Sequence, residues 1–227
     1  MKFMIDAGHG GKDPGAVGNG LQEKDLTLKL ALRIGELLTA RGADVRYTRT
    51  NDVFLELSDR AKAANAAGVQ YFLSVHINAG GGSGFESFTY NGTTGATAAY
   101  RNLIHRHVAA EFSKVGLSDR GQKQANLAVL RETKMPAALL EYGFIDNGKD
   151  STLLKDPGFI ERLAASTANG VAEAFGLPAP QQKDDVSDWA REAWDWAVAS
   201  GITDGTRPKD AVTREEVVTM LHRLMKK

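Results

Sequence analysis

Six short stretches of the chain combine apolar residues with glycine or polar borders, which is the pattern of buried β-strands. They are Lys2–Ala7, Ala43–Arg49, Tyr71–Ile77, Gly84–Tyr90, Ala128–Arg131 and Ala137–Ile145. Between them, apolar residues recur three to four positions apart, the spacing of amphipathic helices. These helical segments are Leu26–Leu38, Leu57–Ala67, Ala96–Val115 and Pro157–Phe175. Strands that alternate with helices predict an α/β fold with a parallel or mixed sheet.

This alternation stops after residue 176. Residues 177–186 contain two prolines among mostly polar residues and predict a linker. Residues 187–227 hold all three tryptophans of the chain and predict a helix, a loop and a second helix. Thr213 and Glu216 have the spacing of a capping box at the start of that second helix. We therefore predict one domain over 1–176 and a small helical module over 187–227.

Composition narrows the chemistry that is open to the chain. Its 227 residues include no cysteine, which excludes thiol nucleophiles, disulfides, iron–sulfur clusters and thiolate zinc sites. Any metal ion must therefore be held by His, Asp, Glu or backbone oxygen. The 28 basic residues balance the 28 acidic ones, so no overall field attracts nucleic acid. No apolar run reaches the roughly 18 residues of a membrane span.

The N-terminus lacks both the long apolar stretch and the small-residue cleavage site of a signal peptide. We therefore expect synthesis in the cytoplasm, with access to targets outside only after release from the cell. The alternative is a secreted protein whose leader has been removed.

Two of the five histidines lie where ligands bind in open α/β sheets. His9 and His76 each follow a predicted strand, at the carboxyl edge of the sheet. Glu23 follows a glycine-rich stretch, residues 8–20, and begins a predicted helix, so loop closure could bring it beside His9. Two histidines and a glutamate with an open fourth position form a recognised catalytic zinc set. The alternatives are ordinary polar strand ends and, for Glu23, a partner of the helix dipole.

Glu141 is the most informative carboxylate of the chain, because it lies within the otherwise apolar segment 137–145. A charge inside an apolar strand is costly unless it is paired or functional. Beside a metal-activated water, such a carboxylate can act first as general base and then as general acid. A structural ion pair is the alternative.

The other three histidines carry no comparable signal. His105 and His107 lie two positions apart on one predicted helix and cannot share a face. His222 lies beside Arg223 near the C-terminus. We expect all three to be structural or surface residues.

Motifs spread in order over residues 1–176 resemble the zinc-dependent N-acetylmuramoyl-L-alanine amidases of the Amidase_3 type. They include Ile5–Ala16, Glu23–Leu28, Val45–Arg49, Leu73–Ala79, Asp119–Lys123 and Leu140–Asn147. The resemblance implies a mixed, mostly parallel six-stranded sheet with helices on both faces. It also implies that His9, Glu23 and His76 are ligands of one Zn²⁺ per chain and that Glu141 is the catalytic glutamate.

The implied reaction is hydrolysis of the amide between the lactyl group of N-acetylmuramic acid and the L-alanine of the stem peptide. Bacterial peptidoglycan is therefore the expected substrate. Asn78 lies two residues past His76 on the same face, and Arg131 lies at the end of a predicted strand. We predict that both contact the substrate.

The C-terminal module has a resemblance of its own. Residues 185–190, 201–205 and 212–215 resemble one S-layer-homology repeat, a unit that commonly occurs in threes and binds cell-wall polysaccharide. The usual aromatic residue after the second glycine is replaced by Thr206. Binding of secondary cell-wall polysaccharide, with self-association into a homo-oligomer, is one expectation. A helical cap that packs its tryptophans on the first domain is the other.

A phage endolysin that acts on the wall at host lysis is the leading interpretation of the whole chain. A secreted host autolysin with the same activity is the second. A zinc peptidase that cuts within the stem peptide, and a non-catalytic wall-binding protein, are further alternatives.

Overall fold

The computed structural model describes residues 1–179, 186–203 and 212–225. The chain divides into two compact units, Met1–Pro180 and Gln181–Lys227. Most of the predicted linker and the loop that contains Gly205 lie outside the described residues. Within the described ranges, no helix has both the length and the hydropathy that crossing a bilayer demands.

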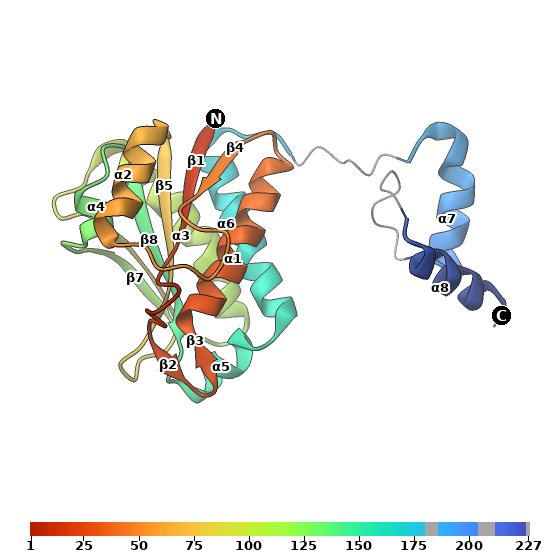
Figure 1. The fold of residues 1–227 in the computed structure, drawn as a ribbon, viewed down its shortest axis with the longest axis horizontal. Coiled ribbons are helices and arrows are strands. Elements are labelled where there is room, and N and C mark those ends of the chain that lie inside the picture. The colour runs from red at the N-terminus through yellow and green to blue at the C-terminus, as the bar shows by residue number, and fades with distance from the viewer. Residues whose placement is uncertain (180–185, 204–211, 226–227) are drawn as a thin grey trace. The chain divides into compact units, whose positions relative to one another are not determined.

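A six-stranded sheet forms the centre of unit 1 (Figure 1). In the order in which they lie side by side, its strands are β4 (Asp44–Tyr47), β1 (Lys2–Ala7), β5 (Tyr71–Asn78), β8 (Ala137–Phe144), β6 (Phe85–Thr89) and β7 (Asp119–Gln124). All neighbouring pairs are parallel except β6 and β8, which are antiparallel. The predicted mixed, mostly parallel sheet is therefore confirmed. A separate hairpin of β2 (Val17–Gly18) and β3 (Leu21–Gln22) lies between β1 and the first helix.

Helices cover both faces of this sheet. The larger layer consists of α1 (Glu23–Thr39), α3 (Gly95–Lys114) and α6 (Pro157–Phe175). α6 packs against both α1 and α3, and the three helices enclose the main core. The smaller layer consists of α2 (Leu57–Ala67) and α4 (Ala128–Arg131), over a second, smaller core. Side chains alternate between the faces along each strand: Phe3 and Ile5 of β1 join the main core, whereas Met4 joins the smaller one.

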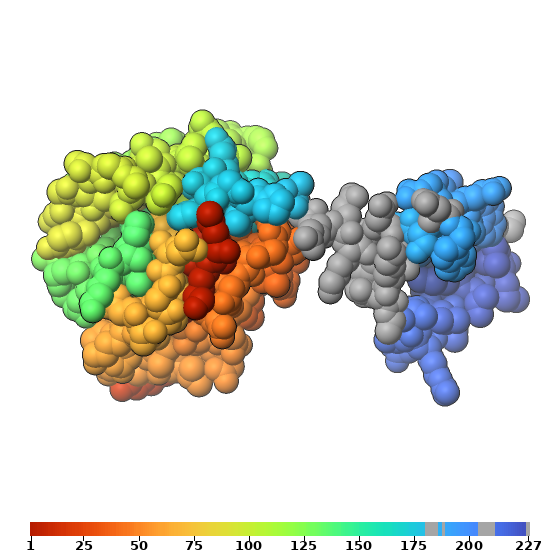
Figure 2. All heavy atoms as spheres, turned by 90° about the horizontal axis from the view of Figure 1, so that it is seen from above, coloured from red at the N-terminus to blue at the C-terminus, as the bar shows by residue number. Residues whose placement is uncertain are grey.

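A short helix, α5 (Gly148–Leu154), follows β8, and its N-cap Asn147 accepts hydrogen bonds from the first-turn amides of Lys149 and Asp150. At the opposite end of the sheet the N-terminus lies beside the end of α6. The red and cyan spheres of Figure 2 meet there, and the rings of Phe3 and Phe175 are 5.1 Å apart.

One of the six predicted strands is wrong. Residues 128–131 form the single-turn helix α4, and the sixth strand is instead β7, Asp119–Gln124. A four-residue apolar run fits a buried helical turn as well as a strand, so its periodicity cannot separate the two. The hydrophobic pattern does not predict β7, because β7 is an edge strand with polar, partly exposed residues and a glycine.

Unit 2 contains a 3₁₀ turn (Asp188–Ala190), α7 (Arg191–Ala199) and α8 (Arg214–Met225). The predicted capping box is confirmed: the Glu216 amide donates to Thr213 Oγ1 at 3.2 Å, and the Thr213 amide donates to Glu216 Oε2 at 2.8 Å. Neither helix buries any of its own residues. Trp189 is 89% exposed and Trp196 is 55% exposed.

Candidate functional site

The loop after β1 places His9 against the sheet. His9 itself has a φ of 60°, in the left-handed region that non-glycine residues rarely adopt. Gly8 and Gly15 are required for close packing around it. A Cβ on Gly8 would lie 2.5 Å from the His76 ring, and one on Gly15 would lie 2.6 Å from Glu23 Oε2. The glycine-rich sequence therefore permits the loop to close over these three polar side chains.

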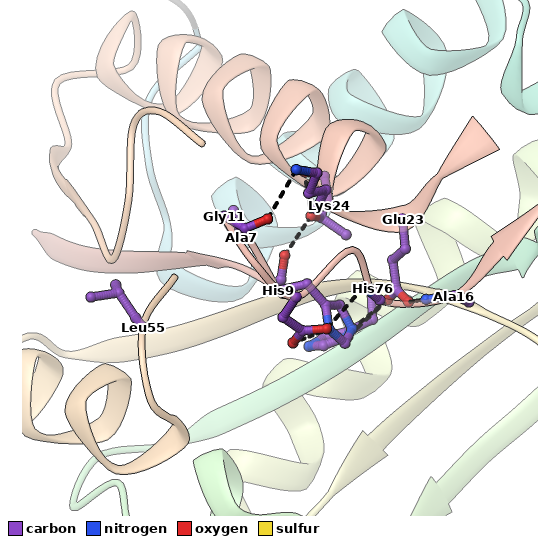
Figure 3. Close-up of polar contacts among 12 residues, drawn as sticks. Ala7, His9, Gly11, Ala16, Glu23, Lys24, Leu55 and His76 are labelled. Carbon is purple, nitrogen blue, oxygen red and sulfur yellow. Dashed lines mark hydrogen bonds and ion pairs between the residues drawn. The ribbon is translucent and has the colours of Figure 1, made fainter. Parts of the chain in front are cut away.

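Three side chains converge on one point at the carboxyl edge of β1 and β5 (Figure 3). Glu23 Oε1 lies 3.2 Å from His9 Nε2 and 3.0 Å from His76 Nδ1. One potential ligand atom from each of the three residues falls within 4.8 Å of the others. Over the described residues, this is the one cluster of His and carboxylate groups with such spacing. The structure thus brings together the three residues that the sequence predicts as metal ligands.

Neighbouring groups hold the donors of this cluster in place. His9 Nδ1 contacts Asp13 Oδ2 at 2.8 Å. The two oxygens of Glu23 accept backbone hydrogen bonds, Oε2 from Ala16 at 2.8 Å and Oε1 from Ile77 at 2.9 Å. A carboxylate on the distal nitrogen of a ligand histidine fixes its ring orientation and tautomer.

Two buried arginines fix the backbone beneath His9. Arg60 donates to the carbonyl oxygen of His9 at 2.7 Å and to Asp6 Oδ1 at 2.9 Å. Arg49 donates to the carbonyl oxygen of Gly8 at 2.8 Å. These charge-assisted bonds tie the loop to the sheet, so His9 is presented from a fixed backbone rather than a mobile one.

The charges in the cluster reinforce one another. Burial opposes the charged form of each group, but the contacts outweigh it. Hydrogen bonds from His76 and His9 hold the pKa of Glu23 well below its usual value. Contact with Glu23 and Asp13 raises the pKa of His9 to about 9, and contact with Glu23 raises that of His76. Glu23 is therefore an ionised carboxylate that faces two imidazoles, an arrangement that positive charge stabilises.

Glu141 lies directly beside this cluster, since it is the register partner of His76 across β5 and β8. Its Oε2 is buried and accepts no hydrogen bond from any described residue. Burial raises the pKa of Glu141 to about 7, and the charges of Glu23 and Glu86 add to this against the opposing effect of His76. A carboxyl group with this pKa can take up or release a proton near neutral pH.

A cavity of about 370 Å³ opens onto the two histidines. Its lining includes His9, His76 and Asp13, and its apolar side chains are Phe54, Leu55, Leu57, Leu127, Ala128, Val129 and Leu139. This volume is in the range of small-molecule and peptide sites.

The two predicted substrate contacts end two different elements, Asn78 at the end of β5 and Arg131 at the end of α4. Asn78 donates through Nδ2 to Glu86 Oε1 at 2.8 Å and accepts from the Ala79 amide. Arg131 ends α4 rather than a strand, and contacts Asn126 and Glu132. Their contact with substrate stays a prediction.

Sequence reasoning missed Asp13, Arg49, Arg60 and Glu86. Glu86 carried a usable signal, because it interrupts an apolar predicted strand as Glu141 does. Asp13 and Arg49 lie within the amidase-like motifs Ile5–Ala16 and Val45–Arg49, but the sequence indicates no role for them or for Arg60, since these roles depend on how the glycine-rich loop closes.

Comparison with known proteins gives a consistent result. Residues 3–173 match the N-acetylmuramoyl-L-alanine amidase family. The sporulation-specific N-acetylmuramoyl-L-alanine amidase of Bacillus subtilis is 49% identical over 179 residues, which cover 78% of this chain and 69% of that protein. The endolysin of Bacillus phage SPP1 is 39% identical over 242 aligned positions, which cover 95% of this chain and 88% of that protein.

Solved structures show the same likeness. The catalytic domain of CwlV, an N-acetylmuramoyl-L-alanine amidase from Bacillus (Paenibacillus) polymyxa var. colistinus, superposes with a TM-score of 0.73 at 37% identity. That match covers 78% of this chain and 99% of the other. The N-acetylmuramoyl-L-alanine amidase from Clostridium difficile 630 also gives a TM-score of 0.73, at 30% identity, over 77% and 96% of the two chains.

Proposed function

Because the chain belongs to the N-acetylmuramoyl-L-alanine amidase family, we propose that it is a zinc-dependent peptidoglycan hydrolase. It cleaves the amide between the lactyl group of N-acetylmuramic acid and the L-alanine of the stem peptide. The observation that carries this proposal is the convergence of His9, Glu23 and His76 on one point, with Glu141 as the next residue across the sheet.

The donor set fits zinc. Two imidazoles and one carboxylate match the ligand types of catalytic zinc sites, and His9, Glu23 and His76 would hold the ion. Asp13 orients His9 from outside the cluster. When bound, zinc supplies a Lewis acid that polarises the scissile carbonyl and makes water a better nucleophile at neutral pH.

The chain's own residues supply the proton transfers. Glu141 accepts a proton from the attacking water at its carboxylate and donates it to the departing nitrogen of L-alanine. Its pKa of about 7 suits both roles. The apolar cavity walls position the substrate and limit competing water around the reacting groups.

Metal analysis combined with wall digestion tests this function. The purified protein should contain about one zinc per chain, and chelation should abolish wall lysis that added zinc restores. Mass spectrometry of the digest should show new L-alanine amino termini on released peptides and intact sugar chains. New amino termini within the stem would indicate a peptidase instead. Full activity of a metal-free preparation would overturn the metal assignment.

We further propose that the protein acts as a phage endolysin. The supporting observation is that the alignment with the SPP1 endolysin covers 95% of the chain, whereas the sporulation amidase aligns with 78%. Expression of the chain inside bacteria should leave cells intact until the membrane is permeabilised, and then lyse them. Lysis without permeabilisation, by protein that the cells export unaided, would favour a host autolysin.

For residues 187–227 we propose a weak cell-wall-binding module that self-associates. Its support is the resemblance to an S-layer-homology repeat together with the exposed Trp189 and Trp196 and the unburied faces of α7 and α8. A short chain of residues 1–176 should retain zinc and hydrolyse soluble muropeptides, but sediment less with purified walls. The full chain should have the solution mass of an oligomer. Equal wall binding by both chains would identify residues 187–227 as a structural cap.

A further inference from the structure

Three acidic or imidazole side chains form a row across neighbouring strands of the sheet. His76 on β5 is opposite Glu141 on β8, and Glu141 is opposite Glu86 on β6. Residues at opposed register positions project from the same face of a sheet, and His76 lines the cavity on that face. With strands about 4.8 Å apart, Glu86 lies about 10 Å from His76.

Glu86 is the buried centre of a cationic group. Its Oε2 accepts from Arg120 Nε at 2.8 Å and from Lys123 Nζ at 2.5 Å, and its Oε1 accepts from Asn78. Although burial raises it, hydrogen bonds from Lys123 and Arg120 hold the pKa of Glu86 below its usual value. One carboxylate thus neutralises only one of two cations, and the group carries one excess positive charge.

That excess charge is accessible. The side chains of Arg120 and Lys123 are 34% and 39% exposed, whereas Glu86 is only 6% exposed. The Arg120 guanidinium lies 4.7 Å from the centroid of the Phe144 ring, and Lys123 Nζ lies 5.8 Å from that of Phe88. Aromatic faces fix the position of cations without using their hydrogen-bond donors.

The Nη groups of Arg120 remain available as hydrogen-bond donors. Only its Nε donates to Glu86, and its Nη groups form no hydrogen bond with any other residue that the structure describes. The paired Nη–H groups of arginine match the two oxygens of a carboxylate. A guanidinium held by Nε and by a ring face therefore presents this end as a preformed anion receptor.

We propose that Arg120 and Lys123 form a subsite that binds a free carboxylate of the stem peptide. This inference rests on the proposed amidase function. An extended chain spans about 3.3–3.6 Å per residue, so Glu86, about 10 Å from His76, lies within the reach of about three residues. Arg120 and Lys123 contact Glu86 from the next strand, β7. A carboxylate on one of the first residues of the stem therefore comes within reach, and we assign it to the second, whose carboxylate would lie beside Arg120 when the scissile amide lies at His76 and Glu141.

Paired substrates and paired variants test the subsite. The substrates are two muramyl tripeptides that differ only at the second stem residue, with a free α-carboxylate in one and a carboxamide in the other. Native enzyme should hydrolyse the carboxylate form with a kcat/KM about 5- to 20-fold higher, mostly through KM, as expected for a partly exposed charge-assisted contact.

Arg120→Gln should remove this preference by lowering kcat/KM for the carboxylate substrate alone, with zinc content unchanged. Lys123→Gln, a second variant in case the first fails to fold, should reduce the preference in the same direction. Arg106→Gln is the matched control, because Arg106, on α3 at the other face of the sheet, forms an exposed ion pair with Glu173 of α6. The control should keep the full preference.

Three results would overturn the subsite. Native enzyme could hydrolyse both substrates equally, or the variants could lose activity on both substrates to the same extent, as expected of a structural ion pair that holds the edge strand β7. A preference that appears only with intact wall bearing anionic polymers would assign the cations to the glycan side. Failure of the native enzyme to hydrolyse either substrate would instead overturn the proposed function.

Discussion

Two histidine–carboxylate clusters lie on opposite faces of the same sheet, and they do different things. On the cavity face, His9 and His76 both point at a single oxygen of Glu23. On the face that packs against α3, His105 forms a linear chain instead. Its Nδ1 is 2.7 Å from Ser87 Oγ, and its Nε2 is 2.9 Å from Asp119 Oδ1.

The difference shows what distinguishes a metal site from a structural network of the same residue types. Both nitrogens of His105 are used by protein groups, and both His105 and Ser87 are buried, so neither a metal nor a substrate reaches them. The Ser87–His105–Asp119 order is that of a hydrolase triad, but its serine is inaccessible. At the other cluster the donors converge, and a cation can take the central position between them.

The largest expected difference between the two clusters is loss of zinc when a histidine of the converging cluster is replaced. His76→Ala leaves two protein ligands, which bind zinc weakly, so zinc content should fall from about one per chain to near zero. His105→Gln should keep its zinc, because His105 lies outside the converging set. Metal analysis of both variants after dialysis checks this. Retention of zinc by His76→Ala would place the metal elsewhere.

Next in size is the effect at Glu141. Glu141→Gln keeps the shape of the side chain but cannot take a proton from water. The rate should fall on the order of 10²- to 10⁴-fold, which is the usual share of general acid–base catalysis. Zinc content should stay near that of the native protein. Loss of zinc from this variant would make Glu141 a ligand, with the roles of Glu141 and Glu23 exchanged.

The residues of the cavity-face site can be predicted from the sequence, because the signal of each lies in the few residues around it. His9, His76 and Glu141 stand out because each is polar at a position where the surrounding pattern expects an apolar strand or a tight turn. Glu23 stands out because it begins a helix directly after the glycine-rich stretch that carries His9. Parallel strands bring their carboxyl ends to one edge whatever the loops do, so strand ends alone place His9 near His76.

What the sequence could not supply depends on long-range closure. Asp13, Arg49 and Arg60 look like ordinary loop or helix surface residues, and only the folded loop turns them toward His9. β7 has no apolar alternation, because an edge strand with exposed sides needs none. His105 was expected to be a structural or a surface residue. Its burial between Ser87 and Asp119 confirms the structural role, but its partners come from two different strands.

The outer carboxylates of the two clusters provide a matched pair. Asp13 contacts His9 and Asp119 contacts His105, and their side chains are 40% and 46% exposed. Asp13→Asn should weaken zinc binding about 10- to 100-fold, the usual effect of losing a carboxylate behind a ligand histidine. Asp119→Asn should leave zinc affinity unchanged. Competition with a chromogenic chelator measures both, and equal effects would remove the distinction between the clusters.

The smallest expected effect is a pH dependence of stability at His105. Burial lowers the pKa of His105 below its ordinary value of about 6.5, against the opposing contact with Asp119. The unfolded chain therefore binds this proton first as the pH falls. The contribution of His105 to the free energy of unfolding is complete above pH 6.5 and is lost as the pH falls through the lower pKa of the folded state.

His105→Gln removes the titrating group and should lower the free energy of unfolding by about 1–3 kcal/mol at pH 7.5. Denaturant unfolding of the native protein and this variant at pH 7.5 and 5.5 should therefore show a gap that narrows on acidification, since His9 and His76 titrate alike in both. A gap that widens at pH 5.5 would mean that the folded protein prefers protonated His105, with Asp119 rather than burial dominating its charge.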